Sequence, residues 1–202
     1  MNNKEYVRSI AIIDTCNFTN IAIESVCQQI STNIVVLRFH SVEALIQSPK
    51  RSHIDLVFYD TLTTNNIIID PEIDIRKIRE NISGVKICIF SILHQFMSIK
   101  SADYEIDKRI SLEDFNFFTR ILCQNDGERC KRNYSVIFYD RMNLSKEQVT
   151  LLRGYLLNLN TKNIADILKC NLRKVYFYRE GTLRKGKLRE NFYKDIGRLI
   201  NP

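Results

Sequence analysis

Four side chains that could act together follow separate apolar runs in the first part of the chain. Asp14, Asp60 and Ser91 each come directly after such a run, and Lys108 follows a further, weaker one. Polar groups in these positions gather at one edge of the sheet when the strands are parallel. Two carboxylates there could hold a hard cation, which prefers carboxylate oxygens, or could form an ionic cluster with the lysine. The spacing therefore predicts one polar site made of these four residues.

The apolar runs are continuous rather than alternating, and helical patterns separate them. Strands of this composition are buried on both faces, as in a parallel sheet that helices cover on its two sides. We therefore expect a small doubly wound α/β domain with strands within the runs 8–13, 34–39, 54–59 and 85–90.

Helices are expected at 18–30, 41–46, 71–82 and 111–123. Ser41 is the expected cap of the second, and Ser111-Leu112-Glu113-Asp114 resembles a capping box that opens the fourth. In the fourth helix we expect core or interface positions for Phe115, Phe117 and Phe118. In the first helix, the helical period predicts one inward face with six members: Phe18, Ile21, Ala22, Ser25, Val26 and Ile30.

Residues 8–123 resemble the receiver domain of response regulators. The stretches that match are IIDT, LVFYD, ICIFS and SADYEIDK, which contain the four strand-end residues. The resemblance implies that Asp60 accepts a phosphoryl group. It also implies that a pair of acidic residues holds magnesium and that Lys108 and Ser91 contact the phosphate.

One departure from the receiver pattern concerns the metal. Thr15 stands where that family has the second acidic residue, so only Asp14 is left to help Asp60 hold a cation. Losing one of three carboxylates should weaken a magnesium site. Two hypotheses remain: a working phosphoacceptor, or a structural ionic cluster of Asp14, Asp60 and Lys108 that is not phosphorylated.

Positive charge is concentrated at the other end of the chain. The whole sequence has a net charge of +7, but residues 143–202 contain 13 Lys+Arg against 5 Asp+Glu, a net charge of +8. A neutral module followed by a basic one is typical of a regulator with a nucleic-acid-binding end. Binding to a membrane surface is the competing interpretation, but the basic segment has no broad Leu/Phe face to enter lipid.

Residues 160–185 have the pattern of two short helices joined by a turn. Asn160 can cap the first helix and Asn171 the second. In a DNA-binding helix-turn-helix the second helix enters the major groove. The alternative is an ordinary helical hairpin with a solvated basic face. The expected inward residues are Ile164, Ala165, Leu168, Val175 and Leu183, and Tyr178 is expected to point outward.

If the segment is a helix-turn-helix, the second helix supplies most of the DNA contacts. Tyr176, Phe177 and Glu180 occupy the outward positions expected to face base edges. Lys162 of the first helix is a further expected DNA-binding residue. Phosphate contacts are expected from the cationic side chains of the second helix: Arg173, Lys174, Arg179, Arg184 and Lys185.

The basic end also resembles the LuxR-type (NarL- or GerE-type) DNA-binding domain, without gaps. The matching residues are Leu144-Ser145, Leu151-Leu152, Ile164-Ala165, Leu168, Val175, Leu183-Arg184-Lys185 and Arg189. Asn158 and Lys169 stand where that family often has glycine, and Tyr178 where it often has histidine. Asn adopts a left-handed backbone readily, whereas Lys does so less easily. Gly181 inside the second helix costs about 1 kcal/mol relative to Ala.

Together the two resemblances imply a bacterial transcription regulator of the RcsA/RcsB-like type, whose degenerate receiver domain is used for dimerisation or partner contact. Regulators of the RcsA kind are auxiliary and act beside a conventional partner. Its expected parts are a receiver-like domain (1–123), a linker (124–142) and a helix-turn-helix domain (143–202). The expected partners are double-stranded promoter DNA and a second subunit, in a homodimer or in a heterodimer with a related regulator. The segment 191–200 is one candidate dimer surface. The alternative is an interaction protein that sequesters a related regulator without specific DNA binding of its own.

The sequence gives little support for disulfides, a histidine metal site or a catalytic motif. The six cysteines show no CxxC spacing and are expected to be reduced core residues of a cytoplasmic protein that acts at the nucleoid. His40, His53 and His94 share no ligand spacing, and no Gly-rich phosphate loop or Ser-His-Asp arrangement is present. We therefore expect no enzyme, no membrane segment and no cofactor, apart from magnesium at a site that Thr15 weakens.

Overall fold

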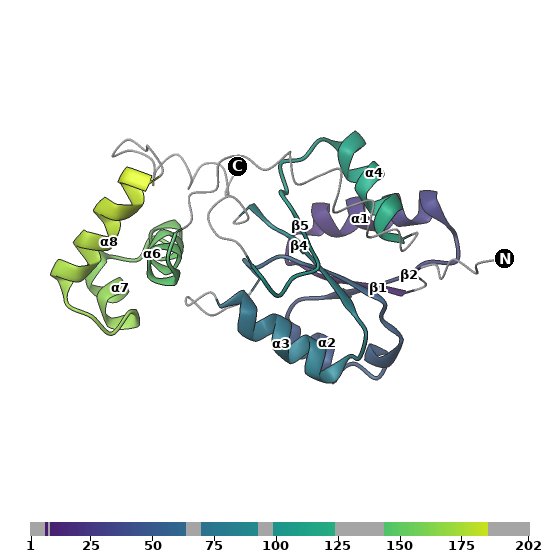
Figure 1. The fold of residues 1–202 in the computed structure, drawn as a ribbon, viewed down its shortest axis with the longest axis horizontal. Helices are drawn as coiled ribbons and strands as arrows, with labels where there is room; N and C mark the ends of the chain where they lie inside the picture. Colours follow the sequence, from purple (N-terminus) through teal and green to yellow (C-terminus); the bar gives the residue numbers. More distant parts are fainter. Residues whose placement is uncertain (1–6, 8, 64–69, 93–98, 124–143, 186–202) are drawn as a thin grey trace. The chain divides into compact units, whose positions relative to one another are not determined.

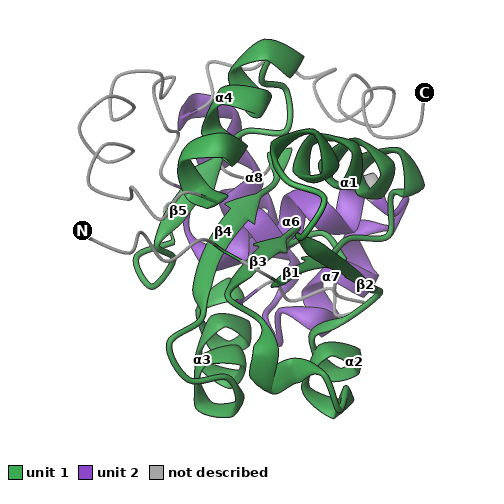
Figure 2. Cartoon of the chain, turned by 90° about the vertical axis from the view of Figure 1, so that its right-hand side faces the viewer, with its two compact units in different colours: residues 1–64, 71–95, 99–139 green, residues 65–70, 96–98, 140–202 purple. Residues whose placement is uncertain are grey.

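The computed structural model describes residues 7, 9–63, 70–92, 99–123 and 144–185 (Figure 1). The chain divides into two compact units, coloured separately in Figure 2. The described part of unit 1 comprises residues 7, 9–63, 71–92 and 99–123, and that of unit 2 comprises residues 144–185 together with Asp70. The expected linker, 124–142, lies outside the described residues, so the domain boundaries stay predictions.

Unit 1 is built on a five-stranded sheet in which all neighbouring strands are parallel. The strand order is β2-β1-β3-β4-β5, so the direction of winding reverses between β1 and β3. In open α/β sheets, such a reversal opens a crevice at the carboxyl ends of the strands. The strands are β1 (Ser9–Ile13), β2 (Val35–Phe39), β3 (Leu56–Tyr59), β4 (Lys86–Phe90) and β5 (Tyr104–Ile106).

Helices cover the sheet on both faces, which confirms the predicted doubly wound α/β fold. Helices α1 (Asn17–Ile30) and α4 (Leu112–Cys123) lie side by side on one face (Figure 2). On the opposite face lie α2 (Val42–Gln47) and α3 (Pro71–Asn81), with the short 3-10 helix η1 (Arg51–His53) before β3. Because both faces are covered, β1 and β3 are fully buried, which explains their uninterrupted apolar sequences.

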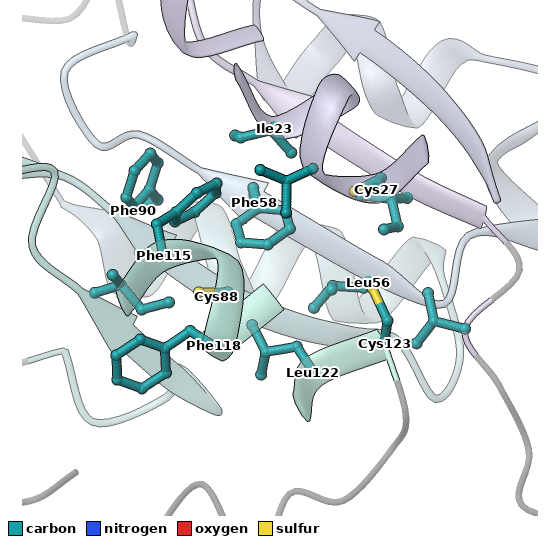
Figure 3. Close-up of a cluster of buried hydrophobic side chains, with 14 of the residues drawn as sticks. Ile23, Cys27, Leu56, Phe58, Cys88, Phe90, Phe115, Phe118, Leu122 and Cys123 are labelled. Atoms are coloured by element: carbon teal, nitrogen blue, oxygen red, sulfur yellow. The ribbon is translucent and has the colours of Figure 1, made fainter. Parts of the chain in front are cut away.

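The core between the sheet and α1/α4 is rich in phenylalanine (Figure 3). The ring of Phe115 stacks on that of Phe90 with 4.9 Å between the centroids, and Phe58 contacts both. Phe118 is buried as well, as expected, whereas Phe117 is 46% exposed. Cysteines 27, 88 and 123 are buried free thiols, which agrees with the prediction, but Cys16 is exposed.

The inward face of α1 differs from the prediction. Phe18 is 86% exposed and Ile21 is 55% exposed, while the buried residues are Asn20, Ile23, Val26 and Cys27. Of the six predicted inward residues only Val26 is buried: Ser25 is exposed as well, and Ala22 and Ile30 are half-buried, so the predicted face is wrong along most of the helix. The face that meets the core is made of Ile23, Val26 and Cys27. Asn20 lies on the same side and donates its side-chain N–H to the backbone carbonyl of Asp14, at 3.2 Å.

Unit 2 contains three described helices: α6 (Lys146–Leu156), α7 (Thr161–Ile167) and α8 (Leu172–Lys185). Ser145 and Gln148 form a reciprocal capping box at the start of α6. Leu151, Ile164, Ala165 and Val175 form the buried core where the three helices meet. None of the helices in the described ranges is long and apolar enough to cross a membrane.

Candidate functional site

Three of the four predicted strand-end residues meet at the carboxyl edge of the sheet in unit 1. Asp14 follows β1, Asp60 follows β3 and Lys108 follows β5. Nζ of Lys108 lies 2.6 Å from Oδ2 of Asp14 and 2.5 Å from Oδ2 of Asp60. The lysine side chain is 15% exposed and the two aspartate side chains 3% and 6%. One ammonium group therefore bridges two buried carboxylates, and we call these three residues the ion cluster.

The second oxygen of each carboxylate is held by the backbone. Oδ1 of Asp14 accepts a hydrogen bond from the N–H of Cys16 at 2.7 Å, and Oδ1 of Asp60 accepts one from the N–H of Leu62 at 3.0 Å. Hydrogen bonds to ionised groups are short and strong. All four carboxylate oxygens of the ion cluster therefore have a donor within the protein.

The electrostatics of the ion cluster follow from its unequal charges. Burial raises the pKa of Asp14 above its ordinary 3.8, and the attraction of Lys108 opposes this without cancelling it. Burial also lowers the pKa of Lys108, but the attraction of Asp60 and Asp14 outweighs it, so that this pKa is raised above 10.5. Because two carboxylates face one ammonium, the buried cluster has one negative charge that no cation compensates. The lysine is therefore strongly held in its charged form, while Asp14 is incompletely compensated.

The fourth predicted residue, Ser91, pairs with a neighbour that the sequence analysis did not single out. Ser91 and Thr61 are both fully buried, and their hydroxyl oxygens lie 3.0 Å apart. Thr63 donates its hydroxyl to the backbone carbonyl of Asp60 at 2.7 Å. The turn after β3 is therefore organised by threonine hydroxyls. The sequence could have indicated Thr61 and Thr63 as site residues, because they lie directly after the predicted end of the strand.

The residues of the ion cluster fit magnesium poorly. Magnesium requires several oxygen ligands in octahedral geometry. Asp14 and Asp60 already share the Lys108 ammonium, and Thr15 adds no carboxylate beside them. Within the described residues, no group of three or more His, Cys, Asp or Glu side chains could hold a metal ion. A cation would have to displace Lys108 from both carboxylates.

In unit 2, α7 and α8 form the predicted helix-turn-helix. Side-chain oxygens of Asn160 and Asn171 each accept a hydrogen bond from the backbone N–H three residues on, both at 2.9 Å. Asn158 and Lys169, the two positions where the LuxR-type domain often has glycine, have φ values of 57° and 50°. The turns therefore require the left-handed backbone that glycine adopts most easily, and Lys169 adopts it at a cost.

Helix α8 presents most of the predicted DNA-binding side chains to solvent. Phe177 is 70% exposed and Tyr176 is 52% exposed, while Val175 on the opposite side is fully buried. The other predicted residues that are exposed, including one from α7, are Lys162, Arg173, Lys174, Glu180, Arg184 and Lys185.

Three positions of α8 differ from the sequence-based expectation: Arg179, Tyr178 and Leu183, which was expected to point inward but is only half-buried. Arg179 is only half exposed. Tyr178, expected to point outward, packs against the core of unit 2, where the ammonium of Lys174 lies 5.9 Å from its ring centroid. Thr182, for which there was no expectation, is fully buried instead of Leu183 and donates its hydroxyl to the carbonyl of Tyr178 at 2.8 Å. A buried Thr on a basic helix carries no apolar signal, so the sequence did not indicate it.

Close approaches at two glycines also escaped prediction. A Cβ atom on Gly154 of α6 would lie 2.8 Å from Cγ1 of Ile164 in α7. A Cβ atom on Gly181 of α8 would lie 2.8 Å from Nε2 of Gln148 in α6. Glycine therefore allows the close approach of α6 to α7 at Gly154 and of α8 to α6 at Gly181.

Comparisons with known proteins identify the fold. No protein-family model and no curated protein sequence matches the chain. Among solved structures, RcsB from Salmonella enterica serovar Typhimurium bound to promoter rprA with the phosphomimetic BeF3- gives a TM-score of 0.65 at 15% identity. That match covers 92% of this chain and 95% of RcsB. The same regulator bound to promoter P1flhDC gives 0.63 at 15% identity, over 93% and 96% of the two chains.

The chain therefore has the fold of a response regulator, with a receiver-like α/β unit followed by a helix-turn-helix unit. RcsB is one protein with which it shares this fold over nearly the whole chain. This confirms, for the fold, the resemblance to LuxR- and NarL-type response regulators that the sequence predicts.

Proposed function

We propose that this protein is a DNA-binding transcription regulator that places α8 in the major groove. The observation that carries the proposal is the two-sided character of α8. Val175 and Thr182 are fully buried in the helical unit, whereas Arg173, Lys174 and Arg184 are exposed on the other side. Cationic side chains on a rigid helix can hold phosphates while outward residues meet base edges. Solved structures of RcsB, which has the same fold, include complexes with promoter DNA, and they support this assignment.

We further propose that the protein acts as a dimer on DNA, with a second copy or with a related regulator. A single recognition helix covers only a few base pairs, too few to select one site in a genome, so helix-turn-helix proteins pair across two half-sites. A solved structure of two RcsB dimers on two parallel DNAs supports this arrangement. The candidate dimer segment 191–200 lies outside the described residues.

In the receiver-like unit we propose that the ion cluster is structural and that Asp60 is a poor phosphoacceptor. Both oxygens of Asp60 already accept hydrogen bonds, one from Leu62 and one from Lys108. Attack on a phosphoryl donor needs a carboxylate oxygen that can leave its ammonium partner and a metal to neutralise the incoming charge, and Thr15 supplies no carboxylate for that metal. The unit then serves to contact a partner rather than to receive a phosphoryl signal.

Fluorescence anisotropy of the full chain with labelled duplex DNA, over a series of salt concentrations, tests the DNA-binding proposal. We expect the logarithm of the affinity to fall linearly with the logarithm of the salt concentration. Lys174→Ala and Arg184→Ala should each weaken binding to all duplexes and reduce the salt slope by about 1. Lys77→Ala is the matched control, because Lys77 is an exposed lysine of α3.

Two results would count against DNA binding. One is affinity that does not depend on salt, and the other is an equal effect of Lys77→Ala and Lys174→Ala. A stable complex with a related regulator, formed without any duplex affinity, would instead support the sequestering function.

A further inference from the structure

Helix α8 carries an apolar surface that phosphate binding does not explain. Phe177 is 70% exposed and Tyr176 is 52% exposed, on a helix whose remaining outward side chains are mostly charged. Exposing a phenylalanine ring to water is unfavourable, and an apolar partner would remove that surface from solvent. Phosphate oxygens offer no such partner. An apolar group at the bottom of the groove that receives α8 would remove the ring at position 177 from water.

The position of Phe177 on α8 places it at the centre of the outward face. With 3.6 residues per turn, Arg173 lies about one turn before it and Arg184 about two turns after it, on the same side. Val175 and Thr182, on the opposite side, are fully buried. Arg173 and Arg184 can therefore meet the phosphates that border the groove while Phe177 lies between them, over the base edges.

Only one group on the floor of the major groove suits a phenylalanine. Adenine, guanine and cytosine present hydrogen-bond donors and acceptors there, and thymine alone adds an apolar C5-methyl group. Covering a polar edge with an aromatic ring removes its water without replacing the hydrogen bonds, which is unfavourable. Glu180, one turn further on and exposed, would be repelled by phosphates and can accept a hydrogen bond from an amino group such as that of cytosine.

We propose that Phe177 reads the C5-methyl group of a thymine in the major groove, so that the half-site of this protein contains a thymine at the position under that ring. This inference rests on the proposed function, because it takes α8 as the helix in the groove. It adds a determinant of specificity, because one apolar contact distinguishes thymine from the other bases, whereas the salt-dependent phosphate contacts do not depend on sequence.

The test begins with selection of duplexes from a random pool by the full chain. Each thymine of the selected duplex is then replaced, one at a time, by deoxyuridine, which pairs identically and lacks only the methyl group. At one position we expect the replacement to weaken binding by the wild type about fourfold, the value of one buried methyl group. Phe177→Ala should bind the thymine and uracil duplexes equally, and Phe177→Leu should keep part of the difference. Lys174→Ala is the control, since it should weaken both duplexes by the same factor.

The outcomes separate this inference from the proposal on which it rests. If no thymine of the selected duplex responds to uracil in the wild type, the inference is wrong while DNA binding stands. The same holds if Phe177→Ala still discriminates between the two bases. If the pool yields no enriched duplex and binding shows no salt dependence, the proposed function itself fails. Phe177 is mostly exposed, so its variants should fold, and far-UV circular dichroism checks this.

Discussion

Nζ of Lys108 lies 2.6 Å from Oδ2 of Asp14, although the two residues are 94 positions apart in the chain. The contact joins the end of β5 to the end of β1 across the sheet edge, and Asp60 completes it from β3. A buried ion pair contributes little when compared with a well-packed apolar replacement, but breaking it from one side leaves charges without compensation. The ion cluster is therefore most sensitive to the loss of its only cation.

The first prediction concerns removal of that cation. Lys108→Met keeps an unbranched side chain that is one atom shorter, and it leaves two buried carboxylates without their cation. We expect the free energy of unfolding at pH 7 to fall by about 3–5 kcal/mol. Urea denaturation followed by circular dichroism measures it. Lys77→Met is the control and should change stability by less than about 0.5 kcal/mol, because its partner Glu43 and the lysine itself are exposed. Equal effects of the two substitutions would show that the ion cluster has no structural role.

The second prediction concerns pH. The pKa of Asp14 is raised in the folded protein above 3.8, so the folded state binds this proton more tightly than the unfolded state does. The contribution of Asp14 to stability therefore rises as the pH falls through its folded pKa toward 3.8. For Lys108, whose folded pKa is raised, the contribution is complete below pH 10.5 and is lost as the pH rises through the folded value.

Comparison of the wild type with Asp14→Asn isolates the acidic part of this dependence. We expect the wild type to gain stability relative to Asp14→Asn as the pH is lowered from 7 toward 4. Titrating groups outside the ion cluster are common to both proteins and cancel in the difference. A stability difference that stays constant, or that moves the other way, would show that Asp14 is well compensated by Lys108.

A third prediction concerns the two glycines of the helical unit. Gly154→Ala places a methyl group 2.8 Å from Cγ1 of Ile164, a buried β-branched side chain that has little room to move. Overpacking of this kind costs about 1–3 kcal/mol and should outweigh the gain in helix propensity. Gly181→Ala meets Nε2 at the end of the buried Gln148 side chain, whose Oε1 accepts the capping-box hydrogen bond from the N–H of Ser145, so this side chain can shift only a little. We therefore expect Gly154→Ala to be clearly destabilising and Gly181→Ala to be destabilising by less, as measured by thermal unfolding of the full chain.

The fourth prediction concerns the turn before α8. Lys169 has a φ of 50°, a conformation that costs about 1–2 kcal/mol for residues with a Cβ atom. Lys169→Gly relieves this strain, although glycine also gains freedom in the unfolded chain. We expect a net stabilisation of about 0.5–1 kcal/mol in denaturant unfolding. Asn158→Gly, at a φ of 57°, should change stability less, because Asn tolerates this backbone. A larger gain at Asn158 than at Lys169 would contradict the explanation.

The fifth prediction concerns regulation. If the ion cluster is structural, Asp60→Asn should leave the affinity for DNA unchanged within about twofold, because Lys108 keeps Asp14 as a partner. Acetyl phosphate should neither label the wild type at Asp60 nor change its affinity. Mass spectrometry of the treated protein and anisotropy with DNA are the two measurements. Stoichiometric labelling of Asp60, with a change in DNA affinity that Asp60→Asn abolishes, would establish a working phosphoacceptor.

Local features of this protein could be predicted from its sequence because they depend on near neighbours in the chain. Continuous apolar runs predicted parallel strands, which are buried at β1 and β3 but not at the edge strand β2, and the polar residues that follow the runs predicted which groups reach the sheet edge. Ser41 caps α2 by accepting a hydrogen bond from the N–H of Ala44 at 3.1 Å, and Asn160 caps α7 in the same way. Asn158 lies at a left-handed turn, as a residue that replaces glycine should.

Contacts between distant segments were decided only by the tertiary structure. The period of α1 predicted an inward Phe18, but the helix packs through Ile23, Val26 and Cys27, so this ring is exposed. For Lys108 the sequence left an ionic cluster with both carboxylates as one of two hypotheses, and the tertiary structure decided that one ammonium bridges them. The apolar pattern of one helix is compatible with more than one inward face, so it does not fix how the helix is rotated about its axis. The end of a strand fixes the position of a residue but not the direction of its side chain. Both are settled by packing and hydrogen bonding with segments far away in the chain.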